Sequence, residues 1–248
     1  MNKEISAEKL NKLMFLILDS DGVLIPRGTK ISQKEKGDEF KVSFSTKVIS
    51  YDLAEKIKEL SKFLTIYISS GRSMIYLQAM YARLGNSVGL IAENGSVAFD
   101  KGYFKQLADF PYGYFDLLNA IREDIKDLPI LGFEPKQFIL TVHCEKELRE
   151  VYEIVARHDV FKHLKVMWNG EAFDIQYHKL SKASGLEKLE FKREEMIAIG
   201  DRVNDKEMIE YAGIGVSADK EALPAEYWVE GKNLGGEILV NYLLNKLS

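Results

Sequence analysis

The sequence is poor in the features that mark secreted and membrane-spanning proteins. Among its 248 residues there is a single cysteine, Cys144, so no internal disulfide can form and nothing indicates an oxidising compartment. No stretch approaches the roughly 20 apolar residues that a membrane helix needs. The apolar run from Met14 to Leu18 lacks the small-residue cleavage site of a signal peptide. We therefore expect a cytoplasmic protein.

An excess of charge of one sign is also lacking. The 34 basic and 38 acidic residues leave a net charge of −4, and there is no basic face for a nucleic acid and no polybasic segment for a membrane surface. Neither a P-loop nor a dinucleotide fingerprint is present, and the four histidines lack metal-ligand spacing. We expect a small metabolite as the partner, with no nucleic acid and no membrane, and the sequence leaves the oligomeric state open.

Short apolar runs that stop at polar residues dominate what is present. Runs without polar alternation are typical of strands that are buried on both faces of a parallel sheet. A segment at 51–62 places its apolar residues on one helical face, which gives a strand, crossover helix and strand in succession. The pattern predicts an α/β protein with a Rossmann-like, doubly wound parallel sheet, and its main strands are expected at 14–18, 63–68, 88–92 and 196–200.

The texture changes near residue 100. Most of the prolines and a cluster of aromatics surround a helical segment at 115–128, and a strand, a helix and a hairpin with Asn169-Gly170 in its turn follow. We predict a core of residues 1–99 and 179–248 that carries an inserted small α+β cap domain at 100–178. A second insertion, from Ile25 to Ile49, alternates on both arms and predicts a hairpin with Gly37 in the turn, which could act as a flap near the site.

Four acids follow two of the predicted strands: Asp19, Asp21, Asp201 and Asp205. The carboxyl ends of parallel strands lie at one edge of an open sheet, where ligands bind. Carboxylates crowded at that edge repel one another and need a cation. Their hard oxygen ligands suit Mg²⁺, so we predict a magnesium site made from these four residues.

Groups that can hold a phosphate accompany the acids. Ser70 offers a hydroxyl and Gly71 a backbone amide at another strand end, and Lys182 supplies a positive charge where the core resumes. Carboxylates, a cation, a hydroxyl and an ammonium are the groups that phosphoryl transfer requires. Arg72 is explained more simply by an ion pair with a nearby acid, and we leave it out of the predicted site.

These motifs carry a resemblance to a known family. Asp19-Ser20-Asp21-Gly22, the Ser70-Gly71-Arg72 turn, Lys182 and the loop from Gly200 to Asp205 resemble, in order and spacing, the four signature motifs of the haloacid dehalogenase (HAD) superfamily of phosphatases. The position of the inserted unit between the second and third motifs is similar to that of the C2-capped branch, type IIB.

The resemblance implies a role for each residue. Asp19 would be the nucleophile that forms an aspartyl-phosphate, and Asp21 the general acid and base. Mg²⁺ would be held by Asp19, the backbone carbonyl of Asp21 and Asp201, with Asp205 nearby. Phosphate-binding groups would come from Ser70, Gly71, Lys182 and Asn204.

The implied activity is magnesium-dependent hydrolysis of a small phosphomonoester, and we expect a sugar phosphate. Two alternatives stay open at this point. A related branch uses the same motifs in phosphosugar mutases, and the fold could also persist in a binding protein without turnover. The sequence names neither the substrate nor the pathway.

Overall fold

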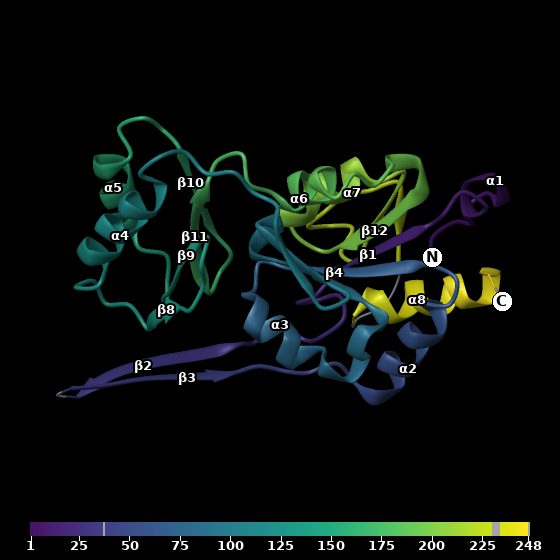
Figure 1. The fold of residues 1–248 in the computed structure, drawn as a ribbon, viewed down its shortest axis with the longest axis horizontal. Helices are drawn as coiled ribbons and strands as arrows, with labels where there is room; N and C mark the ends of the chain where they lie inside the picture. Colours follow the sequence, from purple (N-terminus) through teal and green to yellow (C-terminus); the bar gives the residue numbers. More distant parts are fainter. Residues whose placement is uncertain (37, 230–233, 248) are drawn as a thin grey trace. The chain divides into compact units, whose positions relative to one another are not determined.

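The structure, a computed structural model, describes residues 1–36, 38–229 and 234–247. The chain forms two compact units (Figure 1). The first contains residues 1–28, 47–108 and 181–248, and the second contains residues 29–46 and 109–180. No helix among the described residues has the length and apolar character that crossing a membrane requires.

An eight-stranded sheet forms the centre of the first unit, in the order β14-β13-β12-β1-β4-β5-β6-β7. Neighbouring strands from β14 to β5 are parallel, and β6 and β7 are antiparallel additions at one edge. The strands are β1 (Phe15–Asp19), β4 (Thr65–Ser69), β5 (Gly89–Ala92), β6 (Val97–Asp100), β7 (Tyr103–Gln106), β12 (Met196–Gly200), β13 (Ile214–Ser217) and β14 (Tyr227–Trp228).

Helices cover both faces of this sheet (Figure 1). Along β1, Leu16 and Leu18 belong to one apolar cluster together with residues of α2 and α8, whereas Ile17 belongs to a second cluster with residues of α6 and α7. Because successive strand residues point to opposite faces, an unbroken apolar run is what two covered faces require. The α-helices are α1 (Ala7–Leu10), α2 (Tyr51–Leu60), α3 (Met74–Met80), α6 (Lys182–Lys188), α7 (Lys206–Tyr211) and α8 (Gly235–Leu247), and the 3₁₀ turns are η1 (Ala82–Ser87), η2 (Glu93–Gly95), η3 (Arg193–Glu195) and η4 (Val203–Asp205).

The second unit is a four-stranded antiparallel sheet with two helices packed on one face. The sheet order is β10-β11-β9-β8, and its apolar side includes Val142, Phe173 and Ile175, which pack with residues of both helices. Trp168 and Tyr177, which are partly buried, also pack against this cluster. The elements are α4 (Tyr114–Ile125), β8 (Gly132–Glu134), β9 (Leu140–His143), α5 (Arg149–His158), β10 (Leu164–Trp168) and β11 (Ala172–Tyr177).

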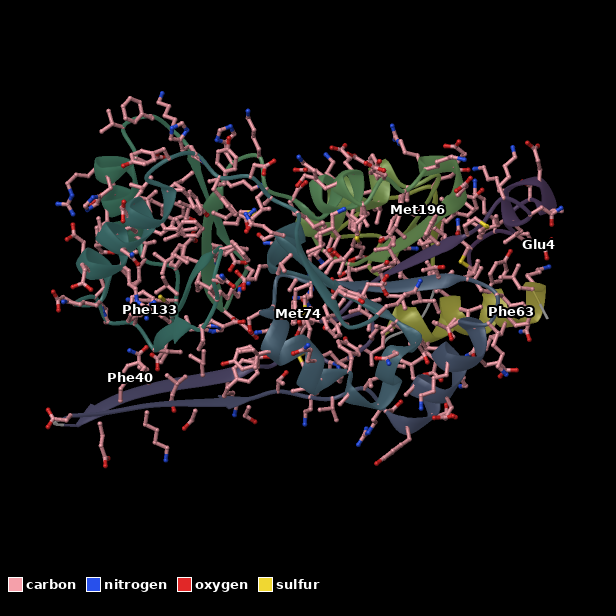
Figure 2. The ribbon with its side chains drawn as sticks, viewed as in Figure 1. Glu4, Phe40, Phe63, Met74, Phe133 and Met196 are labelled. Carbon is pink, nitrogen blue, oxygen red and sulfur yellow. The ribbon has the colours of Figure 1, made fainter. Side chains whose placement is uncertain are left out.

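The insertion after Asp21 forms the expected hairpin, and this hairpin belongs to the second unit. Its strands β2 (Lys30–Lys36) and β3 (Glu39–Ser45) pair antiparallel. The backbone N–H of Phe133 donates a 3.0 Å hydrogen bond to the side chain of Gln33, which ties β2 to β8. Phe40 on β3 and Phe133 on β8 are labelled in Figure 2. Gly37, predicted in the turn, lies outside the described residues.

The predicted fold class is confirmed, with differences at the unit boundaries. The predicted core of 1–99 and 179–248 included residues 29–46, which the structure groups with the second unit. The later divisions lie after Ala108 and after Leu180 instead of at 99 and 179. Residues 103–106 form β7 and pair antiparallel with β6, which extends the sheet of the first unit. The sequence did not predict this strand, because all four of its residues are exposed and show no alternation of buried and exposed positions.

Candidate active site

The strand that carries Asp19 lies in the middle of the large sheet. Asp19 is the last residue of β1 and pairs in register with Ser69, the last residue of β4. On its other side, β1 pairs in parallel with β12, which ends at Gly200. Three predicted motifs therefore leave the sheet from adjacent strands at the same edge, as the rule for open parallel sheets predicts.

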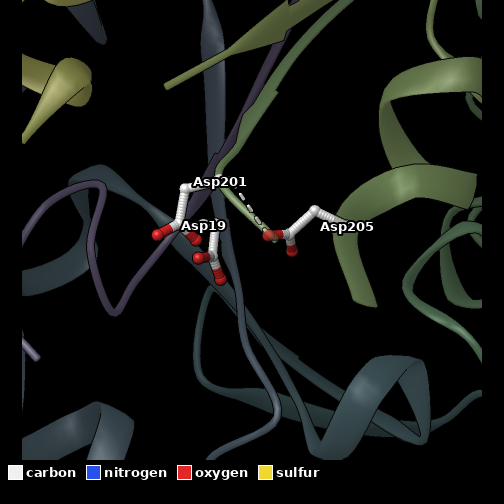
Figure 3. Close-up of side chains that lie close together, drawn as sticks. All are labelled: Asp19, Asp201 and Asp205. Carbon is white, nitrogen blue, oxygen red and sulfur yellow. Dashed lines mark hydrogen bonds between the residues drawn. The ribbon is translucent and has the colours of Figure 1, made fainter. Parts of the chain in front are cut away.

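Three of the four predicted acids converge at this edge (Figure 3). One carboxylate oxygen each from Asp19, Asp201 and Asp205 lies within 4.8 Å of the other two. All three residues are buried, with exposed fractions of 5%, 5% and 0%. Burying carboxylates this close together, away from water, costs free energy unless cations neutralise their charges.

Backbone groups fix the carboxylate of Asp205. Its Oδ2 atom accepts hydrogen bonds from the backbone N–H groups of Asp201 (3.0 Å) and Arg202 (3.1 Å). Gly200 allows this approach, since a Cβ atom there would lie 2.3 Å from the Cβ of Asp205. The loop after β12 is therefore closed around the side chain of Asp205.

Lys182 is the internal counter-ion of the cluster. Its ammonium pairs with the carboxylates of both Asp19 and Asp205, and its side chain is 1% exposed. Lys182 begins α6, whose start is held by a capping box between Ser181 and Ser184. A close approach holds this helix in place, because a Cβ atom on Gly95 would lie 2.4 Å from the carbonyl oxygen of Ser181.

The electrostatics of the cluster follow from its burial. Burial and the neighbouring Asp205 raise the pKa of Asp19 to about 8. Burial also raises the pKa of Asp201, against the opposing pull of Arg27. Burial disfavours the charge on Lys182, but Asp19 and Asp205 outweigh it and hold the pKa of Lys182 above its usual value. The site therefore has more negative charge than Lys182 can satisfy, and a divalent cation fits this donor set.

Asp21 lies apart from these three side chains and pairs with Arg72. The Nε and Nη2 atoms of Arg72 donate hydrogen bonds to the two carboxylate oxygens of Asp21, and both bonds are 3.0 Å long. This two-point contact fixes the plane of the carboxylate. The sequence suggested an ion pair between Arg72 and a local acid. Arg72 does pair with an acid, but the acid is Asp21, 51 positions away in the sequence.

The remaining predicted residues occupy different positions. Ser70 is 2% exposed, and its Oγ accepts a 3.2 Å hydrogen bond from the backbone N–H of Arg72. A Cβ atom on Gly71 would lie 3.0 Å from Oδ1 of Asn94, so this turn is packed against the β5–β6 connection. Asn204 lies in η4 and is exposed. Its predicted role in phosphate binding stays a prediction, as do those of Ser70 and Gly71.

One contact at the site was not predicted. Nη2 of Arg27 lies 2.7 Å from both carboxylate oxygens of Asp201. The sequence gave no signal for it, because Arg27 precedes the hairpin and is separated from Asp201 by 174 positions. Only the folded β1–β12 pairing brings the two loops together.

A model of a known protein family matches part of this chain. The model of the haloacid dehalogenase-like hydrolase family matches residues 115–222. The matched segment begins in α4 and includes Lys182, Asp201 and Asp205. It is the part of the chain that holds the third and fourth predicted motifs.

Two curated relatives are similar in sequence. "Putative phosphatase YkrA" of Bacillus subtilis is 31% identical over 116 residues, which are 45% of this chain and 43% of that protein. The phosphoglycolate phosphatase of Methanopyrus kandleri is 26% identical over 171 residues, which are 65% of this chain and 72% of that protein. The match thus spans less than half the length of the Bacillus protein.

Solved structures share the fold over nearly the whole chain. The C-terminal domain of a trehalose-6-phosphate phosphatase from C. albicans aligns with a TM-score of 0.66 at 17% identity, over 97% of this chain and 95% of that one. A sugar phosphatase of HAD subclass IIB aligns with a TM-score of 0.63 at 18% identity, over 92% and 98% of the two chains. At these identities the likeness concerns the fold.

Proposed function

We propose that the chain is a magnesium-dependent phosphatase of the haloacid dehalogenase-like hydrolase family, with Asp19 as its nucleophile. The observation that carries the proposal is the buried cluster of Asp19, Asp201 and Asp205 around the ammonium of Lys182. A site with no ionic function gains nothing from three buried carboxylates, and burial raises the pKa of two of them, Asp19 and Asp201.

The metal fits the residues present. Asp19, Asp201 and Asp205 offer hard oxygen atoms within 4.8 Å of one another, and the backbone carbonyl of Asp21 is the fourth group that the family pattern assigns. When bound, Mg²⁺ would supply positive charge next to the transferring phosphoryl group and lower the repulsion between that group and Asp19.

The reaction proposed for these residues has two steps. A carboxylate oxygen of Asp19 attacks phosphorus, the ester oxygen leaves, and Asp21 gives that oxygen a proton. Asp21 then takes a proton from water, the water oxygen attacks phosphorus, and the bond to Asp19 breaks to release inorganic phosphate. Lys182 and the turn at Ser70-Gly71 hold the phosphoryl oxygens, and Arg72 keeps the carboxylate of Asp21 oriented between the steps.

We place the substrate among small phosphomonoesters, with sugar phosphates first. Structures with this fold include a trehalose-6-phosphate phosphatase and a sugar phosphatase, whereas a sequence relative is a phosphoglycolate phosphatase. Phosphoglycolate is therefore the main competing substrate. We also propose the cytoplasmic location that was predicted from the sequence. The single cysteine on which that prediction partly rests, Cys144, is buried and forms no disulfide.

The test is phosphate release from a panel of sugar phosphates, phosphoglycolate and nucleotides, with Mg²⁺ or with a chelator. We expect release from one or a few compounds only with Mg²⁺, and a loss of at least about a thousandfold in Asp19→Asn. Asp52→Asn is the matched control, because it makes the same chemical change at a carboxylate that is 74% exposed.

The products of the same assay separate the alternatives. Free phosphate supports the hydrolase, an isomeric sugar phosphate would show a mutase, and binding without turnover would show a protein that has kept only the fold. Undiminished phosphate release by Asp19→Asn would overturn the assignment of the nucleophile.

A further inference from the structure

Arg27 holds the carboxylate of Asp201 in the way that a bound cation would. One nitrogen of its guanidinium lies 2.7 Å from both Oδ1 and Oδ2. Both oxygens therefore already accept a charge-assisted hydrogen bond from a cationic side chain. Asp201 is one of the three acids whose oxygens could hold a metal ion.

Backbone also packs closely against the contact between Asp201 and Arg27. A Cβ atom on Gly22 would lie 2.2 Å from Oδ2 of Asp201 and 2.9 Å from Nε of Arg27. Gly22 has a φ of +88°, so the loop adopts a conformation that favours glycine. The backbone of Gly22 thus packs against the contact between Asp201 and Arg27, which leaves the carboxylate little room to turn while Arg27 stays in place.

Charge balance at the site points in the same direction. Counted with Asp19 ionised, as a metal ligand must be, three carboxylates, from Asp19, Asp201 and Asp205, are in hydrogen-bond contact with two cationic side chains, Lys182 and Arg27. A divalent ion added to this set would leave it with one positive charge in excess. If Arg27 leaves when the ion enters, three negative charges meet three positive charges.

Arg27 can leave at low cost, whereas Lys182 cannot. The side chain of Arg27 is 41% exposed, against 1% for Lys182, so water can solvate the released guanidinium. The next residue, Gly28, has a φ of +112° and no atom within 4 Å of a Cβ built on it. The chain beside Arg27 therefore has open space in which to move.

We infer that Arg27 competes with the divalent metal ion for Asp201, and that its release is part of metal binding. The inference rests on the metal-dependent function proposed above and assigns a role to a residue outside the four motifs. Arg27 is a positioning residue in this account: it keeps Asp201 neutralised and oriented in the metal-free protein and lowers the apparent affinity for the metal.

The test is direct metal binding, with no reaction in the assay. Mn²⁺ serves as the probe, since the electron paramagnetic resonance signal of the free ion reports the unbound concentration, and Mg²⁺ is added as a competitor. In Arg27→Gln we expect the Kd for Mn²⁺ to fall by about fivefold or more, the scale of a partly exposed ion pair. Arg27→Lys keeps the charge and should lie between the variant and the wild type.

Arg202→Gln is the matched control for the general field of a positive charge. Arg202 is also close to Asp201 and 49% exposed, but its nearest contact to that carboxylate is 3.9 Å. We expect this variant to change Kd by less than about twofold, because exposed and distant charges are screened. An equal fall in Arg27→Gln and Arg202→Gln would show a field effect and overturn the competition.

Melting temperatures provide a second readout that also checks folding. The rise in Tm on adding Mg²⁺ should be larger in Arg27→Gln than in the wild type, since the metal then replaces no existing ion pair. An unchanged or higher Kd in a folded Arg27→Gln would contradict the inference even where phosphatase activity is confirmed. Metal-dependent activity that fails to appear while Mn²⁺ binds as described would instead contradict the proposed function.

Discussion

Among the described residues, each unit contains a lysine that is buried among carboxylates, but the charges around the two lysines are balanced differently. In the second unit, Nζ of Lys136 lies 2.7 Å from Oγ1 of Thr141, 3.2 Å from Asp174 and 3.8 Å from Glu134. Nε2 of His143 lies 3.1 Å from the same Glu134. Two acids there share a lysine and a histidine.

The cluster in the first unit has more acids than its own buried base can satisfy. Lys182 pairs with Asp19 and Asp205, and the third acid, Asp201, depends on the partly exposed Arg27. Polar groups that serve only the fold are expected to be satisfied by one another. On our proposal a cation completes the cluster around Lys182, whereas the acids around Lys136 already have a second basic side chain, His143, within the same sheet.

Removing either lysine should cause the largest loss of stability, and Mg²⁺ should distinguish the two. Lys182→Met and Lys136→Met each leave buried carboxylates without their ammonium, at a cost of about 3–5 kcal/mol in the free energy of unfolding. Denaturant unfolding with a chelator measures both losses. Added Mg²⁺ should recover part of the loss in Lys182→Met and none in Lys136→Met. Equal recovery in the two variants would remove the distinction between the clusters.

A double variant sharpens the assignment of the second network. Lys136→Met combined with Asp174→Asn removes both members of an ion pair at once, so the partner is no longer left charged and buried. We expect the double variant to lose about 1–3 kcal/mol less in the free energy of unfolding than the sum of the losses in the two single variants. The measurement is a double-mutant cycle in denaturant. Simple additivity would show that Lys136 and Asp174 act independently.

The excess of acid in the first unit should appear as a dependence of stability on pH. The pKa of Asp19 is raised from 3.8 to about 8 by burial and by Asp205. Between these two values the folded protein keeps the proton on Asp19, whereas the unfolded chain has lost it. The stability from this proton is complete below the pKa of the unfolded state and is lost as the pH rises through the pKa of the folded state. Asp19→Asn carries no such charge.

In thermal melts with a chelator, the Tm of Asp19→Asn should rise relative to that of the wild type between about pH 5 and about pH 8. A change of about 2–4 °C corresponds to roughly 1 kcal/mol for a chain of this size. Mg²⁺ should reduce or reverse the difference at the upper end of this range. A gap that stays constant with pH would show that Asp19 is already ionised throughout.

Exposed ion pairs should show the smallest effect. Lys58 and Glu55 lie 2.8 Å apart on α2, with side chains that are 37% and 69% exposed. Lys58→Ala should change the free energy of unfolding by less than about 0.5 kcal/mol. A loss comparable to that of Lys136→Met would mean that burial does not explain the different contributions of the exposed and buried ion pairs to stability.

The sequence predicted the elements that bury apolar residues on a regular period. The strands at Phe15–Asp19 and Met196–Gly200 were expected because an unbroken apolar run has one stable position, between two layers of helices. The exposed strand β7 and the three-residue strand β8 were missed, because neither carries enough apolar periodicity to show in the sequence.

The site was predictable to the extent that it lies at strand ends. Asp19, Asp201 and Asp205 were expected together and lie together, because parallel strands share one carboxyl edge. The contacts of Arg27 with Asp201 and of Arg72 with Asp21 depend on side-chain directions in loops. Loop geometry has no periodic signature in a sequence, so the acid with which each arginine pairs is known only from the fold.

Trapping the phosphorylated enzyme tests the central claim most directly. Asp21→Asn would be mixed with an aryl phosphate, whose leaving group needs little protonation, in the presence of Mg²⁺, and its peptides would be read by mass spectrometry. We predict a phosphoryl group on the peptide that contains Asp19, because the variant lacks the base for the second step, and none in the double variant with Asp19→Asn. Continued release of phosphate with no phosphorylated peptide, or a phosphoryl group on another residue, would contradict the account.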